Sequence, residues 1–214
     1  MAQTTGEERI SRRARQRLRH RSEILEAAEE VFSENGYHST TMEEIARRAD
    51  FSVGSIYYFF KNKEELYSEI LLEKAAMVEK RLRRLMDEES GPGKKIKKYF
   101  MARLDLFWEH PRFFRLFFHE TRGTVTNPGA GYTPEAVQQY HRFRSYLEGV
   151  LEEGVKAGVF RPLEIKSIVF VLEGTLRAYL EYLSLLDHPR RNQDEERGLF
   201  DIFARGVMLL NNSS

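Results

Sequence analysis

The 214-residue chain contains no cysteine and no long apolar segment. Without cysteine it can form no disulfide, no thiolate metal site and no catalytic thiol. The longest run of Ile, Val, Leu and Phe covers residues 168–172, whereas a membrane span needs about 20 apolar residues. The amino-terminal residues are polar and arginine-rich, without the apolar segment of a secretion signal. We therefore expect a cytoplasmic protein with no membrane partner.

Motifs typical of enzymes and metal sites are also missing. The glycine-rich segment 123–131 lacks the Gly-Lys-Ser/Thr ending of a phosphate-binding loop, and it follows a helical pattern rather than a strand. No histidine pair has the spacing of a helical zinc site; the six histidines are residues 20, 38, 110, 119, 141 and 188. We expect no metal, no cofactor and no enzymatic activity. The alternative, a helical enzyme with an aromatic cavity, has no nucleophile or phosphate motif to support it.

Positive charge is concentrated at one end of an almost neutral chain. The totals are 34 Lys+Arg against 33 Asp+Glu. Seven arginines and no acidic residue lie from Arg9 to Arg21, whereas most charged residues from Ser22 to Asp50 are acidic. Such a basic segment suits phosphate binding, and a solvated terminal tail is the alternative. We expect residues 1–19 to form a basic, disordered arm.

Helical periodicity dominates the rest of the chain. Apolar residues recur at spacings of three and four, and no segment shows the alternation of a strand bounded by turn residues. Glycine and proline end the segments, most clearly at Ser90-Gly91-Pro92-Gly93. We expect an all-α fold of about nine helices. The expected helices span residues 22–35, 42–48, 53–60, 63–89, 94–110, 111–121, 134–157, 163–187 and 194–211.

Two short helices near the amino terminus have the form of a helix-turn-helix. Thr41 and Glu44 form a capping box that begins the first, and Asn62 with Glu65 marks the start of the long helix that follows the pair. In a helix-turn-helix, the second helix enters the DNA major groove. Its outer face offers Ser52, Val53, Ser55 and Tyr57, and small residues there permit close approach to DNA.

Other residues of this segment have competing interpretations. Ile56, Tyr58 and Phe60 are interpreted mainly as core, and a core position for Tyr57 is the alternative to DNA contact. Lys61 and Lys63 are placed to contact phosphate. The candidate DNA contacts are Thr40, Thr41, Arg47, Ser52, Val53, Gly54, Ser55, Tyr57, Tyr58, Lys61 and Lys63.

Segments 40–46 and 51–66 closely resemble the tetracycline-repressor (TetR) family of bacterial transcriptional regulators, and the likeness covers about residues 20–67. The resemblance implies a homodimer that reads the half-sites of a palindromic operator in double-stranded DNA. It also implies DNA contacts at Ser55, Tyr57 and Lys63.

Three positions depart from the pattern of this family. Asp50 stands where Gly is common, and Asp tolerates the left-handed conformation better than most residues. Phe51 replaces a smaller aliphatic residue, which we interpret as core. Phe59 replaces a frequent His, so a phosphate contact is lost there.

The resemblance divides the chain into a DNA-binding domain at 20–67, a connecting helix at 63–89, and a ligand-binding and dimerisation domain at 68–214. Eight aromatics lie between Tyr99 and Phe118. The resemblance places them around a cavity, and such a wall suits a small apolar or aromatic ligand; ordinary core is the alternative. The candidate ligand contacts are Phe100, Arg103, Leu104, Phe107, Trp108, Phe117, His119, Tyr140, Leu176 and Tyr179.

The helix expected at 165–186 is apolar around more than one face, so it must be buried on more than one side. The resemblance pairs it and the last helix with their copies in a dimer; a purely intrachain core is the alternative. The candidate interface residues are Ile168, Leu172, Leu180, Leu183, Phe203 and Val207.

These observations predict a sequence-specific DNA-binding regulator at the bacterial nucleoid, a repressor that a small ligand releases from its operator. Repression is implied by the family alone. The alternative is a DNA-binding architectural protein or an activator without a ligand.

Overall fold

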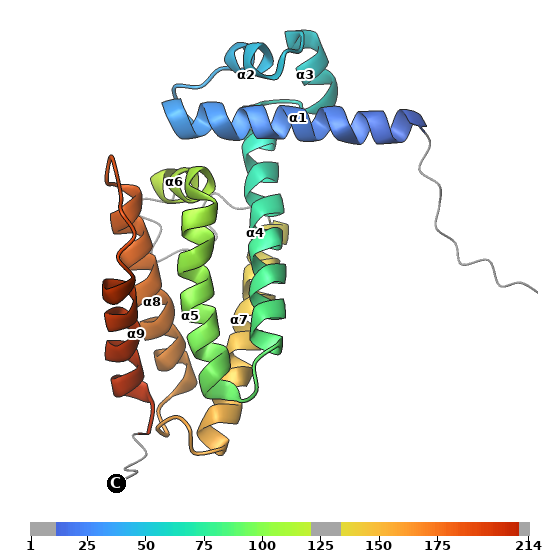
Figure 1. Cartoon of the computed structure of the whole chain (residues 1–214). Coiled ribbons are helices and arrows are strands. Elements are labelled where there is room, and N and C mark those ends of the chain that lie inside the picture. The colour runs from blue at the N-terminus through green and yellow to red at the C-terminus, as the bar shows by residue number, and fades with distance from the viewer. Residues whose placement is uncertain (1–11, 121–133, 210–214) are drawn as a thin grey trace, which may run out of the picture. The chain divides into compact units, whose positions relative to one another are not determined.

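The computed structural model of the chain describes residues 12–120 and 134–209, without the side chains of His119, Glu120 and Ala136. The expected loop at 122–132 lies outside the described residues. Within them the fold is all-α, as predicted, with nine helices and one isolated β-bridge (Figure 1). The helices are α1 (Arg12–Asn35), α2 (Met42–Ala49), α3 (Val53–Phe59), α4 (Lys63–Asp87), α5 (Pro92–Glu109), α6 (Pro111–Glu120), α7 (Pro134–Lys156), α8 (Ile165–Ser184) and α9 (Gln193–Val207).

The chain divides into two compact units after Ile70, where the sequence analysis placed the boundary after residue 67. The amino-terminal unit holds α1, α2, α3 and the first turns of α4. Its centre is a small apolar core to which all four helices contribute, and burial of these side chains is the main force that holds the short helices in place. The core includes Ile24, Ala28, Phe32, Ile45, Ile56, Phe60 and Leu66.

Helix α1 begins at Arg12, so the expectation of a disordered arm up to residue 19 is wrong from Arg12 onward. Arginine, glutamine, leucine and alanine, the residues of this stretch, all favour helix. The Arg19 side chain also donates to Glu23 one turn later, at 2.8 Å. Residues 1–11, including Arg9, lie outside the described residues.

The carboxy-terminal unit comprises the rest of α4 and helices α5 to α9. Helix α5 contacts α6, α7, α8 and α9, and its residues Ile96, Phe100 and Leu104 are completely buried. Figure 1 shows α8 and α9 side by side along one flank of α5. Gly154 is required in this unit, because a Cβ there would lie 2.2 Å from the Phe160 ring. Among the described residues, no helix is long and apolar enough to cross a membrane.

Candidate functional site

The start of α2 is held by the predicted capping box. The Thr41 hydroxyl accepts a hydrogen bond from the Glu44 backbone N–H at 3.2 Å, and the Thr41 backbone N–H donates to the Glu44 carboxylate at 2.9 Å. These bonds favour the charged carboxylate, so they lower the pKa of Glu44. Local sequence alone therefore determines where α2 begins.

The turn between α2 and α3 depends on Asp50, which has φ 59° and ψ 41° in the left-handed region. The Phe51 N–H then closes the turn on the Ala46 carbonyl at 3.0 Å. The Ser52 hydroxyl caps α3 by accepting from the Ser55 N–H at 3.1 Å, and the two hydroxyls lie 2.7 Å apart. The turn thus brings two hydroxyl groups together at the amino-terminal end of α3.

Helix α3 is anchored by one side chain and exposes most of the others. Ile56 is fully buried, whereas Tyr57 and Tyr58 are 50% and 69% exposed. The interpretation of Tyr58 as core is wrong, because a helix of seven residues buries only the side turned toward its neighbours. The candidate Ser52 and Gly54 are also exposed, and Val53 and Ser55 are half-buried. Helix α3 and its cap therefore present the exposed side chains of Ser52, Tyr57 and Tyr58.

Two side chains predicted to contact DNA, those of Thr40 and Lys63, form hydrogen bonds within the amino-terminal unit. The Thr40 side chain is 2% exposed and donates to the Gly36 carbonyl at 2.8 Å. The Lys63 ammonium donates to the carbonyls of Tyr37 and Thr40, each at 2.8 Å, and lies 3.4 Å from a third carbonyl. It also lies 4.5 Å from the centre of the Tyr37 ring. An ammonium has three donors, so Lys63 holds the loop between α1 and α2 rather than offering a free charge.

Three further candidates stay at the surface. Thr41 and Arg47 are exposed, although the Thr41 hydroxyl is engaged in the capping box. Lys61 is exposed at the junction of α3 and α4, and its backbone N–H donates to Glu65 at 2.6 Å. A phosphate contact by its side chain stays a prediction.

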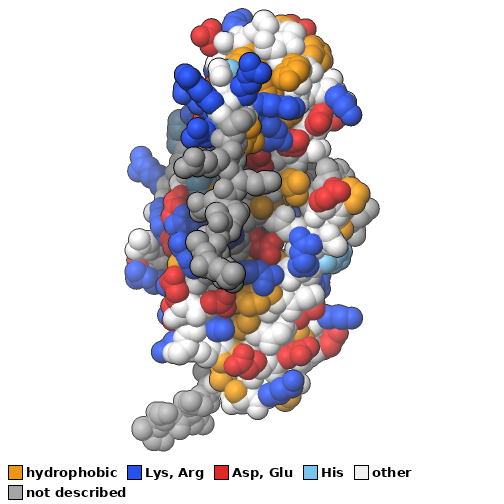
Figure 2. Space-filling model, turned by 90° about the vertical axis from the view of Figure 1, so that its right-hand side faces the viewer, with side chains coloured by type: hydrophobic (Ala, Val, Ile, Leu, Met, Phe, Trp, Pro, Cys, Tyr) orange, Lys and Arg blue, Asp and Glu red, His pale blue; other side chains and the backbone are white. Residues whose placement is uncertain are grey.

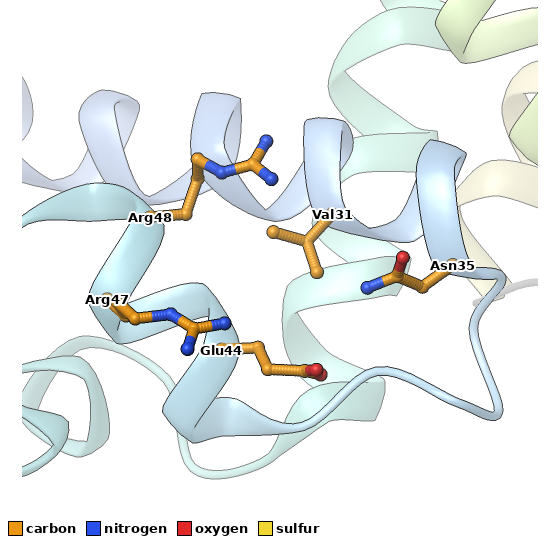
Figure 3. A pocket seen from close by; sticks show the side chains of 5 residues that line it. All are labelled: Val31, Asn35, Glu44, Arg47 and Arg48. Carbon is orange, nitrogen blue, oxygen red and sulfur yellow. The ribbon is translucent and has the colours of Figure 1, made fainter.

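A small pocket lies between α1 and α2. Figure 3 shows Val31 and Asn35 of α1 and Glu44 and Arg47 of α2 around it, and Arg48 reaches toward α1. Its volume is about 240 Å³, below the range of about 300–1,000 Å³ of small-molecule sites. The Glu44 carboxylate at its edge is already engaged in the capping box. We therefore assign no ligand to this pocket.

Arg48, which the sequence analysis did not select, fastens α2 to α1. Its guanidinium contacts Glu34 at 2.7 Å and Glu30 at 3.3 Å. The carboxylates raise the pKa of Arg48, chiefly through the Glu34 hydrogen bond. No local signal could have identified it, because its partners are 14 and 18 residues away.

The first turns of α1 contact the aromatic residues of α3 and its flanks. His20 lies edge-on to Phe51 and Phe59, with ring centres 5.2 and 6.4 Å apart. Arg17 lies over the Tyr58 ring at 5.6 Å. Phe51 is thus only half-buried and serves as a contact for α1. These contacts bring the arginines of α1 beside α3, and Figure 2 shows basic side chains grouped at this end of the unit.

In the carboxy-terminal unit, much of the expected ligand set is core. Phe100 packs against Phe200 at 5.4 Å between ring centres, and Phe107 lies 5.5 Å from Phe114. The His119 side chain lies outside the described residues. The buried candidates are Phe100, Leu104, Phe107, Leu176 and Tyr179, and the half-buried ones are Arg103, Trp108, Phe117 and Tyr140.

Trp108 has a structural partner that the sequence did not reveal. Its indole N–H donates to Glu196 of α9 at 2.8 Å, and the Glu196 side chain is fully buried. Arg191 completes the arrangement by contacting Glu196 at 3.0 Å and Asp105 at 2.6 Å. The buried carboxylate is thus paired and hydrogen-bonded, as a buried charge requires, and it joins α5 to α9.

Glu173 of α8 is the second acid of this interior that sequence reasoning missed. The Tyr99 hydroxyl donates to one of its oxygens at 3.3 Å, and the Tyr140 hydroxyl donates to the other at 3.1 Å. Burial is the main cause that raises the pKa of both phenols, and the nearby carboxylate adds to it. Helices α5, α7 and α8 therefore meet at one polar cluster.

All six expected interface residues are buried within their own chain. Each is at most 5% exposed, because their stripe faces the other helices of the unit. They are Ile168, Leu172, Leu180, Leu183, Phe203 and Val207. The exposed apolar residues of α8 and α9 lie off this stripe: Phe170 and Ile202 are 74% and 73% exposed, and Tyr182 is 56% exposed.

A capped helix, a left-handed turn and a second helix with an exposed tyrosine face define a DNA-binding protein of the helix-turn-helix class. Residues 24–70 match the family described as "Bacterial regulatory proteins, tetR family". The chain belongs to the TetR family and is a DNA-binding transcriptional regulator. Regulators of this family bind DNA operators, dimerise and bind small molecules; they are not enzymes.

Several relatives extend the likeness beyond the DNA-binding unit. The chain is 29% identical over 188 residues to the uncharacterised regulator YhgD of Bacillus subtilis, with 84% of this chain and 92% of YhgD covered. It is 30% identical over 142 residues to the repressor KstR2 of Mycobacterium tuberculosis, with 66% and 70% covered.

A solved structure of the regulator FadR from Bacillus subtilis, in complex with stearoyl-CoA, has the same fold. Its TM-score is 0.72 at 22% identity, with 86% of this chain and 98% of that chain covered.

Proposed function

We propose that this chain is a repressor that holds a palindromic operator as a homodimer and leaves it when a small hydrophobic ligand binds. The observation that carries the proposal is the exposed face of α3, on which Tyr57 and Tyr58 project while Ile56 anchors the helix in the core. Hydroxyl groups on such a face can bond base edges and phosphates.

The arginines of α1 supply sequence-independent affinity in this proposal. Five of the six arginines between Arg12 and Arg21 are exposed, and Arg17 reaches Tyr58 of α3. Arginine contacts with phosphate release counterions and make binding salt-sensitive. The same observation supports the second candidate function, an architectural protein that binds DNA without reading its sequence.

We place the dimer interface on the exposed apolar residues of α8 and α9 instead of the buried stripe. Phe170 and Tyr182 of α8 and Ile202 of α9 supply the apolar area. Open space surrounds Gly174 and Gly206 on the same helices, so a partner helix could approach closely there. A dimer would present two copies of α3, at the spacing of about 34–36 Å that one DNA turn requires.

The ligand region of the proposal is the aromatic wall of α5 and α6. The phenylalanine rings from Phe113 to Phe118 pack against one another, mostly edge-on or tilted, with centre distances of 5.0 to 6.2 Å. Such a wall suits a long apolar chain. The stearoyl-CoA complex of the FadR of the same fold supports a ligand of this kind.

The signal from ligand to DNA would pass through α4. This helix runs without interruption from Lys63 to Asp87, and the boundary between the two units falls within it, after Ile70. A ligand that favours one position of α4 would change the spacing of the two α3 helices. A coupling of about 1–3 kcal/mol would weaken operator binding roughly 5- to 150-fold.

The first test is selection of bound sequences from a random duplex-DNA pool at two salt concentrations. We expect an inverted repeat, from which a hydrophobic ligand then releases the protein. Salt-sensitive binding without any consensus would instead favour the architectural function. Recovery of a consensus without release by any ligand would favour an activator or a ligand-free regulator.

The second test is Tyr57→Ala, with Tyr57→Phe as the matched variant that removes only the hydroxyl. The Tyr57 side chain is 50% exposed and is not part of the buried core, so both variants should remain folded dimers. We expect the Ala variant to bind the selected operator at least tenfold more weakly in a gel-shift titration. Wild-type affinity in both variants would remove Tyr57 from the interface.

A further inference from the structure

Polar side chains from three helices meet inside the carboxy-terminal unit, and we call them the tyrosine–arginine cluster. Its members are Tyr99 and Arg103 of α5, Tyr140 of α7, and Glu173 and Arg177 of α8. Both oxygens of the Glu173 carboxylate accept a tyrosine hydroxyl, at 3.3 and 3.1 Å. Tyr99 is fully buried, and the other four members of the cluster are half-buried.

The two arginines of the cluster lie at the same level of the unit. Tyr99 of α5 contacts Glu173 of α8. Further along these two helices, Trp108 of α5 and Tyr179 of α8 both contact the first turn of α9, at Glu196 and Glu195 respectively. Helices α5 and α8 therefore run in the same direction.

Arg103 follows Tyr99 by four residues, and Arg177 follows Glu173 by four. Each arginine is thus about one helical turn beyond the Tyr99–Glu173 bond, on the same face as the residue four places before it.

Both arginines have an N–H donor that the described residues do not satisfy. The Nε atoms of Arg103 and Arg177 are buried without a hydrogen-bond partner among them. Arg177 Nε is 3.9 Å from the Glu181 carboxylate, too far for a hydrogen bond. The guanidinium carbons lie 6.0 Å from the centres of the Tyr99 and Phe118 rings, which offer no strong acceptor.

The Glu173 carboxylate thus accepts two tyrosine hydroxyls, while neither arginine Nε has a hydrogen-bond partner among the described residues. A buried donor without a partner costs free energy, so such groups are usually satisfied. A guanidinium is best matched by the oxygens of a carboxylate or a phosphate, which it can bind through two parallel hydrogen bonds.

We propose that Arg103 and Arg177 bind the anionic group of the ligand, a carboxylate or a phosphate, while its apolar part lies along the rings of α6. The contact between Arg177 and Phe118 joins the two regions. The ligand is then amphipathic and acidic rather than purely apolar. This inference rests on the proposed ligand-released function and names the chemical class of that ligand.

The test uses the full-length protein and three probes with one acyl chain: palmitate, its coenzyme A thioester and its methyl ester, each below its micelle-forming concentration. Trp108, the only tryptophan of the chain, lies five residues beyond Arg103 on α5 and reports binding through its fluorescence. We expect at least one anionic probe to bind about ten- to a hundredfold more tightly than the ester, as a charge-assisted hydrogen bond predicts.

The two anionic probes distinguish the source of the charge. Tight binding of palmitate assigns a carboxylate, and tight binding of the thioester alone assigns a phosphate. If neither anion binds more tightly than the methyl ester, or if neither binds at all, the proposal is overturned.

Variants separate direct recognition from a structural role. Arg103→Met and Arg177→Met retain much of the apolar stem, so they should lose the preference for the anion while binding the ester as the wild type does. Arg103→Lys keeps the charge and should keep part of the preference. Arg197→Met, at a 63%-exposed arginine of α9, is the matched control and should change nothing. Loss of ester and anion binding together would indicate a structural role and overturn the proposal.

The fluorescence titration needs no DNA, so a failure of the anion site can be distinguished from a failure of the proposed function. Circular dichroism and size-exclusion chromatography establish that each variant is folded. If the anion preference is found but no ligand releases the operator, the repressor function fails and the anion site stands. If release occurs with equal potency for ester and anion, the function stands and the anion site fails.

Discussion

Replacing Lys63 by methionine tests whether its ammonium holds a loop or contacts DNA. The ammonium donates to the Tyr37 and Thr40 carbonyls at 2.8 Å, and the third contact, at 3.4 Å, is weak. A hydrogen bond from a charged donor contributes about 1.5–3 kcal/mol. Because Lys63 is half-buried, we take less than the full value for each bond and expect a loss of about 2 kcal/mol in total. For a chain of this size that lowers Tm by about 4–8 °C.

The effect of this change on DNA binding is the discriminating measurement. A dimer that lost one phosphate contact per protomer would show a slope of log K against log salt that is smaller by about 1.8. We expect Lys63→Met to leave this slope unchanged, since its donors face carbonyls. Lys61→Met is the matched control: its side chain is exposed, so stability should hold while the slope falls.

The assays are thermal unfolding and operator binding at several salt concentrations for both variants. A Lys63→Met protein with wild-type Tm and a slope reduced by about 1.8 would refute the reasoning. It would mean that the ammonium leaves the loop when DNA binds.

Three further predictions concern other parts of the chain. Thr41→Ala removes half of the capping box and should cost about 1 kcal/mol, measured by urea unfolding, with Thr41→Ser as a near-neutral control; equal losses in both would contradict a capping role. Ile202→Glu, at an exposed position of α9, should yield monomers in analytical ultracentrifugation, whereas a stable dimer would exclude this face. Arg17→Gln should weaken binding to random-sequence DNA and reduce its salt dependence, and an unchanged salt slope would remove that arginine from the interface.

The sequence predicted the local features of the DNA-binding unit well. The capping box of Thr41 and Glu44, the cap of α4 by Asn62 and the left-handed Asp50 all appear in the structure. Each depends on bonds within a few residues, so the information lies in the segment itself. The sequence does not reveal that α1 begins at Arg12, because a dense run of arginines is compatible with a helix and with a solvated, disordered arm.

The hydrogen-bond partners of the candidate site residues could not be predicted from the sequence, because they lie far away along the chain. Thr40 and Lys63 were chosen for DNA, yet the Lys63 ammonium bonds carbonyls 23 and 26 residues away. Tyr99 and Glu173, 74 residues apart, gave no sign of their contact. Separations of this size are closed only by packing of whole helices.

The amino-acid sequence is enough to predict the all-α fold, the helix-turn-helix and the membership of a DNA-binding family, since helical period, caps and turns are properties of short segments. The packing of the helices decides which apolar residues of α8 are covered by their own chain and which remain exposed, as Ile168 and Phe170 illustrate. The same packing decides which charges are paired, such as Arg48, and which have a donor without a partner among the described residues, such as Arg103. The physical reason is that burial and charge pairing depend on which helix faces meet, and those meetings join residues that are far apart along the chain.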